Sequence, residues 1–253
     1  MTELTFFHNL IIFWFILACI SFPVLFFFPA SYGRYISKKL SCSIPGNWGW
    51  VIMELPAVLV FGTMFFIGTY NTCITAIVFL LMWMLHYIQR SLIYPFLRRG
   101  REKRMPLNII FMGITFNLVN GYINGRYLFE FSGGYSDEWL TSWQFLTGTG
   151  LFVFGYIINR NADLILHNLR KPEESVYKVP YGGLYKWISC PNYLGEILVW
   201  IGWAIATWSL PGLSFAVWTV ANLVPRAWSY HKWYQTNFDN YPQERKALIP
   251  LLW

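Results

Sequence analysis

Long apolar runs dominate the chain and give the first expectation for its fold. A helix that crosses a membrane needs about 20 predominantly apolar residues. Seven runs reach or approach this length, so the sequence predicts about seven transmembrane helices, at residues 4–28, 48–69, 74–97, 105–123, 143–158, 193–210 and 213–224. The fifth and seventh runs are short, which leaves counts of six or eight open. We expect the seventh run to continue as a helix beyond the membrane.

Basic residues follow these runs on one side. Nearly all of the 19 lysine and arginine residues fall in the loops after the first, third and fifth runs or in the carboxyl-terminal tail. Cytoplasmic loops carry an excess of lysine and arginine. With seven crossings, the amino terminus is therefore expected outside and the carboxyl terminus in the cytoplasm. Two long polar segments, residues 160–191 and 226–253, then lie on the cytoplasmic side, where loops of this length are often functional.

Composition adds to this picture by excluding a soluble domain, a nucleic-acid-binding protein and a metal site. Charged residues make up 12% of the chain, whereas soluble domains contain about 25%. The net charge of +7 lies mainly in short loops, so the expected partner is the lipid bilayer and not a nucleic acid. The four cysteines lack the spacing of a metal site, and we expect no metal. The predicted fold class is an all-α integral membrane protein, with residues 1–253 forming a single membrane domain.

Several ionisable and polar side chains lie inside the predicted membrane helices. Such residues cost about 2.5–3.5 kcal/mol on insertion scales and are functional candidates by default. Glu54 lies in the second run, and Tyr87, Arg90 and Tyr94 share one face of the third. At 1.5 Å per residue, Glu54 and Tyr87 lie at compatible depths in the cytoplasmic half. The alternative interpretation is an ion pair of Glu54 with Arg90 that only stabilises packing, and His86 alone is more readily a packed residue than a ligand.

Three polar stripes with helical spacing lie at the cytoplasmic boundary. Residues three or four apart lie on one face of a helix, so each stripe presents a single polar face: Asn159, Asp163, His167 and Arg170; Asn192, Glu196 and Trp200; Arg226, Tyr230 and Tyr234. Solvated helix faces would explain the first and third stripes equally well. Together the stripes offer amides, carboxylates, arginines and tyrosines to a polar ligand with phosphates. No P-loop and no strand-linked G-x-G-x-x-G identifies such a ligand.

At these same positions the sequence resembles the steroid 5-alpha-reductase family (3-oxo-5-alpha-steroid 4-dehydrogenases). The resemblance is strongest from Asn159 to Trp253 and includes the sequences LRKP at 169–172, VPYGGLYKWISCPNYLGE at 179–196, ATWSLP at 206–211 and RKALIP at 245–250. Upstream matches are patchier and include YGR at 32–34, ELP at 54–56, and His86-Tyr87 with Arg90 and Tyr94.

The resemblance implies a seven-helix membrane enzyme that uses NADPH to reduce the C4–C5 double bond of a 3-oxo-Δ4 steroid. Glu54 and Tyr87 match the pair that holds the steroid 3-keto oxygen and are the implied catalytic residues. The implied cofactor-binding residues are Arg34, Arg90, Asn159, Asp163, Arg170, Tyr177, Asn192, Glu196, Arg226 and Tyr234. Residues 1–105 would then carry the ketone-binding pair, and residues 106–253 would bind the dinucleotide. We expect a monomer.

The chain departs from the family pattern at a few positions. Met53 stands where animal members often have glutamine, Val199 replaces a second carboxylate before Trp200, and Ser229-Tyr230-His231 replaces a histidine-rich run. These departures concern substrate choice more than reaction class. Tyr87 is a natural hydrogen-bond donor to the ketone, whereas Glu54 either donates in its protonated form or orients Tyr87; the sequence leaves both open.

Other functions remain open at this point. A reductase of another lipid alkene (a polyprenol, a sterol or an enoyl thioester) would share the fold and parts of the carboxyl-terminal pattern. A transporter or lipid-binding membrane protein is the alternative from another class, although transporters often contain inverted repeats and no repeat is found here. The expected location is the endoplasmic reticulum membrane in a eukaryote and the cytoplasmic membrane in a bacterium.

Overall fold

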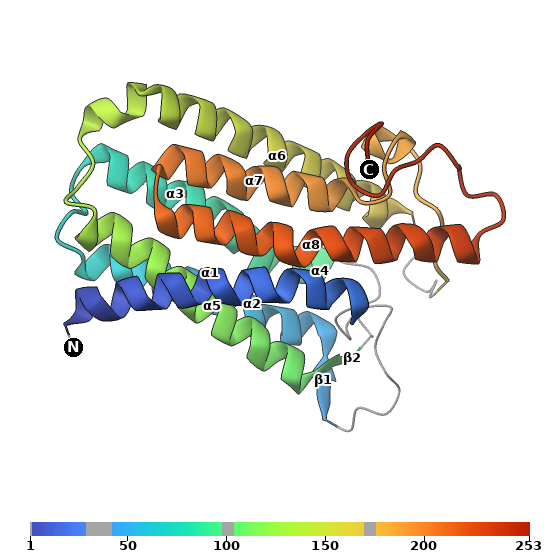
Figure 1. Ribbon diagram of the computed structural model, residues 1–253, viewed down its shortest axis with the longest axis horizontal. Coiled ribbons are helices and arrows are strands. Elements are labelled where there is room, and N and C mark those ends of the chain that lie inside the picture. The colour runs from blue at the N-terminus through green and yellow to red at the C-terminus, as the bar shows by residue number, and fades with distance from the viewer. Residues whose placement is uncertain (1, 29–41, 98–103, 170–175) are drawn as a thin grey trace. The chain divides into compact units, whose positions relative to one another are not determined.

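The computed structural model describes residues 2–28, 42–97, 104–169 and 176–253, and these residues are mainly helical (Figure 1). The α-helices are α1 (Glu3–Phe27), α2 (Gly46–Ile67), α3 (Ile74–Ile88), α4 (Tyr94–Leu97), α5 (Leu107–Arg126), α6 (Trp143–Asn168), α7 (Pro191–Thr207) and α8 (Leu210–Asn237). Shorter elements are the π-helical turns η2 (Gln89–Ile93) and η3 (Tyr127–Phe131), the 3-10 turns η4 (Asp137–Thr141) and η5 (Gly183–Lys186), and the strands β1 (Ser43–Pro45) and β2 (Arg104–Pro106).

Each predicted run coincides with a helix, and the mainly helical fold class is confirmed. The third run is built from α3, η2 and α4, and α8 continues well past the end of the seventh run, as expected. The helix of the fifth run is longer than the run itself, because α6 extends through the polar stripe to Asn168. Within the described part of the chain, three stretches are long and apolar enough to cross a membrane: Glu3–Phe27, Gly46–Ile67 and Ile74–Leu97. The count of seven crossings and their orientation stay predictions.

The antiparallel pair of β1 and β2 was not predicted. Ser43 pairs with Pro106 and Pro45 with Arg104. Three-residue strands are too short for an alternating pattern of apolar and polar residues to reveal. The pair ties the start of α2 to the start of α5, since Pro45 precedes α2 and Pro106 precedes α5.

The chain divides into two compact units. The first comprises Met1–Ile11 and Ser31–Leu146, and the second comprises Ile12–Ala30 and Thr147–Trp253. In the first unit α2 packs on α3 and α5, and aromatic rings fill the contact. Phe61 stacks on Trp83 with ring centroids 4.3 Å apart, and Trp83 Nε1 donates a hydrogen bond to Ala57 O at 3.0 Å. The buried indole therefore has its polar atom satisfied, as a membrane interior requires.

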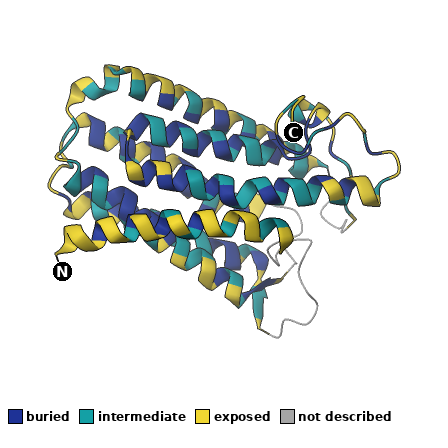
Figure 2. Ribbon diagram, viewed as in Figure 1, coloured by how far each residue is buried: buried dark blue, intermediate teal, exposed yellow. Residues whose placement is uncertain are grey.

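Helix α1 exposes much of its apolar surface, as the yellow segments of its ribbon show (Figure 2). Ile12, Phe13, Ile16 and Ile20 are each more than half exposed. Large apolar side chains gathered on one exposed helix face are unfavourable in water. The face is consistent with the lipid environment that the length and composition of α1 indicate.

In the second unit α6 and α7 approach each other backbone to backbone. Glycines alone make this possible: a Cβ atom at Gly148 would lie 2.2 Å from Ala206 N, one at Gly195 would lie 2.5 Å from Asn159 N, and one at Gly202 would lie 2.5 Å from Phe152 N. Small residues at helix crossings are the usual means of close packing in membranes. Because the neighbouring atoms belong to the backbone, they cannot yield to a side chain.

We expect Gly195→Ala to lower the stability of the protein by about 1–3 kcal/mol, as overpacking of a tight contact does. The matched control is Gly150→Ala in α6, where an added Cβ meets no atom within 4 Å. Thermal unfolding of both variants in detergent checks this. Equal midpoints for the two variants would contradict the close α6–α7 contact.

Candidate functional site

The first unit brings Glu54 and Tyr87 together through a third residue, Asn117. Asn117 Nδ2 donates to Glu54 Oε2 at 3.3 Å and to the Met53 carbonyl at 2.8 Å. Tyr87 Oη lies 3.4 Å from Asn117 Oδ1 and donates to it. The side chains come from three helices, with Glu54 on α2, Tyr87 on α3 and Asn117 on α5. Tyr87 and Asn117 are both 3% exposed, so the cluster lies in an apolar interior where hydrogen bonds are strong.

Asn117 was not predicted from the sequence, because asparagine is not ionisable and does not stand out in an apolar run as a charged group does. A signal was present nonetheless. Asn117, Asn120 and Asn124 recur at three and four residues within an apolar run, which places them on one helix face. All three are buried.

Arg90 lies where α3 passes into the π-helical turn η2. Its guanidinium carbon lies 4.5 Å from the ring centroid of Tyr94 and 5.2 Å from that of Trp50. Cation–π contacts of this kind hold a guanidinium in place. Single π-helical turns inside α-helices are frequent at functional sites. The predicted alignment of Arg90 with Tyr94 on one face is confirmed.

The second unit brings together four residues of the first two polar stripes. Asn159 Nδ2 donates to Asn192 O at 2.9 Å and to Glu196 Oε2 at 3.0 Å. Trp200 Nε1 donates to Glu196 Oε1 at 3.0 Å. Both carboxylate oxygens of Glu196 thus accept a hydrogen bond. These two hydrogen bonds fix the direction of the Glu196 side chain. The bond from Asn159 can form because Gly195 lets α7 lie against the backbone of Asn159.

The other predicted cofactor-binding residues of this unit lie on α6, α8 and the segment before η5. Asp163 forms an ion pair with Arg160 at 3.6 Å, and Arg226 Nη2 donates to Tyr230 Oη at 3.3 Å. Tyr234 stacks on Tyr241, with ring centroids 5.4 Å apart. Tyr177 also belongs to this unit, and its ring lies 5.3 Å from that of Trp233. Two further predicted residues, Arg170 of this unit and Arg34 of the first, lie outside the described residues.

A buried polar network that the sequence did not reveal joins the carboxyl-terminal segment to α8. Ser189 Oγ lies 2.6 Å from His231 Nδ1 and 2.6 Å from Tyr241 Oη, and it donates to the Lys246 carbonyl at 3.1 Å. Two backbone hydrogen bonds complete the join, one from Ser189 N to Lys246 O and one from Lys246 N to Trp187 O. The network fixes Tyr241, on which Tyr234 stacks.

Arg245 lies next to this network and is also buried, with 2% of its surface exposed. Its guanidinium carbon lies 4.8 Å from the ring centroid of Tyr181 and 5.3 Å from that of Tyr241. Its Nε and Nη1 atoms have no hydrogen-bond acceptor among the described residues. A buried cation with unsatisfied N–H groups is costly, and an anionic ligand would satisfy it.

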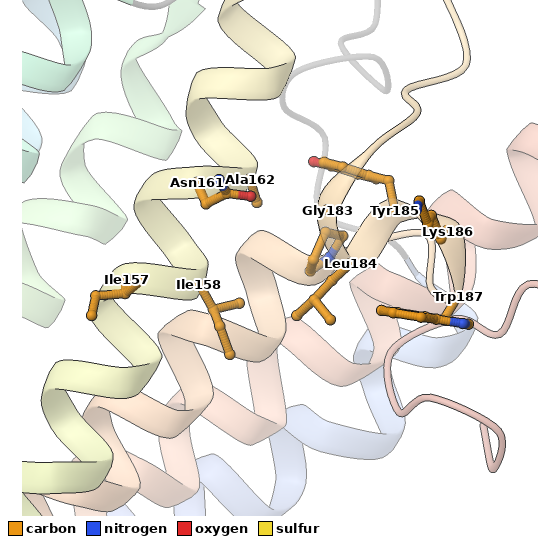
Figure 3. A pocket seen from close by; sticks show the side chains of 10 residues that line it. Ile157, Ile158, Asn161, Ala162, Gly183, Leu184, Tyr185, Lys186 and Trp187 are labelled. Carbon is orange, nitrogen blue, oxygen red and sulfur yellow. The ribbon is translucent and has the colours of Figure 1, made fainter.

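A groove of about 380 Å³ lies beside α6 in the second unit (Figure 3). Ile157 and Ile158 of α6 and Leu184 and Trp187 of the η5 region give it an apolar lining, with Asn161 and Lys186 as polar members. None of the predicted site residues lines it. The groove is therefore distinct from the Asn159–Glu196 cluster.

The buried network predicts acid sensitivity. Burial, and then the charge of Lys246, lower the pKa of His231 below its ordinary value of about 6.5. The unfolded chain then binds a proton more readily than the folded one. The free energy of unfolding is therefore unaffected by His231 above about pH 6.5 and decreases as the pH falls below that value. Between pH 7 and 5.5 the unfolding temperature of the wild type should fall more steeply than that of His231→Asn. Parallel pH dependences would contradict the role of His231.

Comparisons with known proteins test the resemblance directly. Residues 103–253 match the family described as 3-oxo-5-alpha-steroid 4-dehydrogenase. The chain is 42% identical over 230 residues to the 3-oxo-5-alpha-steroid 4-dehydrogenase 1 of Bos taurus, covering 87% of each chain. It is 41% identical over 223 residues to the enzyme of the same name from Homo sapiens, covering 87% of this chain and 85% of the other. It is 36% identical over 257 residues to the steroid 5-alpha-reductase DET2 of Gossypium hirsutum, covering 100% and 99%. The chain therefore belongs to the 3-oxo-5-alpha-steroid 4-dehydrogenase, or steroid 5-alpha-reductase, family of membrane-bound oxidoreductases.

Proposed function

We propose that this protein reduces the C4–C5 double bond of 3-oxo-Δ4 steroids to 5-alpha-dihydro steroids with NADPH as the reductant. The relatives named above support the steroid class. The observation that carries the proposal is the cluster of half-buried Glu54 with buried Asn117 and Tyr87 in the first unit. Its polar groups converge in an apolar interior, which is the arrangement needed to hold one oxo group of an otherwise apolar substrate.

The chemistry of the cluster suits this reaction. NADPH, when bound, supplies a hydride, and addition of hydride at C5 of an enone builds negative charge on the distant 3-oxo oxygen. A hydrogen-bond donor aimed at that oxygen lowers the barrier, and the loss of one such donor typically costs 10²–10³ in rate. Tyr87 is the donor in this proposal. Burial of Tyr87 and Asn117 excludes water, which strengthens the interaction further.

The residues of the second unit suit a dinucleotide. Asn159, Asn192 and Glu196 offer an amide and carboxylate cluster for a carboxamide or ribose, and Arg226 with Tyr234 offers cationic and aromatic contacts for phosphates and a base. The fit rests on an observed feature: Arg245, in the same unit, is buried, and its Nε and Nη1 atoms have no acceptor among the described residues, which suits an anionic ligand. We propose the same role for Asp163, Arg170 and Tyr177 in this unit and for Arg34 and Arg90 in the first.

The same proposal covers the setting of the enzyme. The chain is an integral membrane protein that takes its lipid substrate from the bilayer and acts as a monomer, with residues 1–105 providing the ketone-binding pair and residues 106–253 binding the cofactor. Its membrane is the endoplasmic reticulum in a eukaryotic cell and the cytoplasmic membrane in a bacterial one.

Two substitutions in the ketone-binding pair test the reaction. With progesterone and NADPH, purified protein should form the 5-alpha-dihydro product, and Tyr87→Phe and Glu54→Gln should each lower kcat by about 10²–10³. Tyr122→Phe is the matched control, because Tyr122 is a partly buried tyrosine that contacts Glu3 instead. Mass spectrometry of the product checks this. If NADPH stabilises the wild type against heat but no steroid product forms, the proposed substrate would be wrong, and another lipid alkene would take its place in the proposal.

Cofactor binding is tested separately. Asn192→Leu should weaken NADPH binding by about three- to tenfold, the value of one or two hydrogen bonds, because it removes the side-chain amide. The variant should keep its fold in the absence of cofactor, because the backbone of Asn192, and not its side chain, makes the contact with Asn159. Isothermal titration with NADPH measures the change, with Tyr87→Phe as the variant whose NADPH affinity should stay at the wild-type value. Unchanged NADPH affinity in Asn192→Leu would remove this residue from the proposed site.

A further inference from the structure

We infer that Asn117 is a positioning residue of the active site, one that directs the Tyr87 hydroxyl and holds Oε2 of Glu54 beside it. The inference rests on the proposed function, because it assumes that Glu54 and Tyr87 hold the oxo group. Asn117 touches both residues: its Oδ1 lies 3.4 Å from Tyr87 Oη, and its Nδ2 lies 3.3 Å from Glu54 Oε2. It therefore couples α5 to two groups on α2 and α3.

The direction of the Asn117 amide is set by the backbone of α2. The Met53 carbonyl lies 2.8 Å from Asn117 Nδ2, and a carbonyl oxygen can only accept a hydrogen bond. The amide nitrogen must therefore face α2, and the amide oxygen must face Tyr87. This contact removes the usual ambiguity between the two ends of an asparagine side chain.

The orientation of the amide determines where Tyr87 points its proton. Because Asn117 Oδ1 is an acceptor, the Tyr87 hydroxyl donates to it. At 3.4 Å the bond is longer than the 2.7–2.8 Å usual between oxygens, so it is weak and can be exchanged for a better acceptor. The Tyr87 ring is held by Trp83, with centroids 4.9 Å apart. Asn117 thus keeps the hydroxyl directed without competing strongly with the oxo oxygen of a substrate.

The same amide constrains Glu54. Asn117 Nδ2 donates to Oε2, so Oε2 acts as an acceptor. Asn117 therefore holds Glu54 through Oε2 while its Oδ1 accepts from Tyr87, so one amide ties the two ketone-binding residues to each other.

The test is a double-mutant cycle of Asn117→Leu with Tyr87→Phe in detergent-purified protein, using progesterone and NADPH. Leucine has nearly the shape of asparagine but no polar atom. We expect Asn117→Leu to lower kcat by about 10- to 100-fold while KM for NADPH changes less than about twofold. In the Tyr87→Phe background the same substitution should lower kcat by less than about threefold, because residues that act as one unit are not additive.

Two further variants separate positioning from a structural role. Asn124→Leu is the matched control: Asn124 is a buried asparagine of the same helix that bonds to Asn120, and it should lose stability without the selective loss of kcat. Asn117→Asp still accepts from Tyr87 but places a second carboxyl group beside Glu54. Two such neighbours share a proton, so kcat of Asn117→Asp should fall as the pH rises and recover on acidification.

The outcomes are distinct. A wild type that makes no 5-alpha-dihydro steroid overturns the proposed function, and the role of Asn117 falls with it. If the wild type is active, the positioning role alone is overturned by either of two results. Asn117→Leu keeps the wild-type kcat, or it lowers kcat by the same factor in the wild-type and Tyr87→Phe backgrounds. The same holds if Asn117→Asp has the pH profile of the wild type.

Discussion

The contact between α6 and α7 is the constraint on which the second unit depends. Helix backbones come this close only where no Cβ intervenes, and Gly148, Gly195 and Gly202 provide that space. The consequence is chemical as well as structural. Gly195 lies against the backbone of Asn159, which brings the Asn159 amide within hydrogen-bond distance of both Asn192 O and Glu196 Oε2. A larger residue at position 195 would separate the helices and the polar cluster together.

The first unit meets a different constraint, that of polar groups in a low-dielectric interior. An unsatisfied amide or carboxyl group there is costly, whereas a connected set of such groups satisfies its own members. Asn117 connects Glu54, Tyr87 and the Met53 carbonyl. The fold therefore supports an arrangement that apolar packing alone would not favour, since buried polar groups seldom add net stability over apolar ones. A functional reason for keeping them is the simplest account.

Much of the fold could be predicted because apolar runs report directly on membrane helices. Glu54 and Tyr87 could also be selected, since ionisable and polar groups stand out in such runs and their depth follows from the helical rise. Asn117 could not be assigned to them, because its contacts depend on how α5 packs against α2. The Ser189–His231 contact joins residues 42 positions apart, and nothing in the local pattern indicates that pairing. The length of α6 was underestimated because the apolar run ends at residue 158, whereas the helix continues through polar residues to Asn168.

Two of the three departures from the family pattern, Met53 and Val199, can be explained by the same geometry. Met53 contributes its carbonyl to Asn117, and any residue at position 53 supplies that atom; its side chain instead lies over Gly113, where an added Cβ would meet Met53 Cγ at 2.0 Å. Position 53 can therefore vary without loss of the Asn117 contact. Val199 is fully buried, and its backbone lies against Gly155. A carboxylate at that position would need a partner inside the α6–α7 contact, so the valine is the choice that this close packing favours, and Glu196 is left as the carboxylate that Asn159 and Trp200 hold.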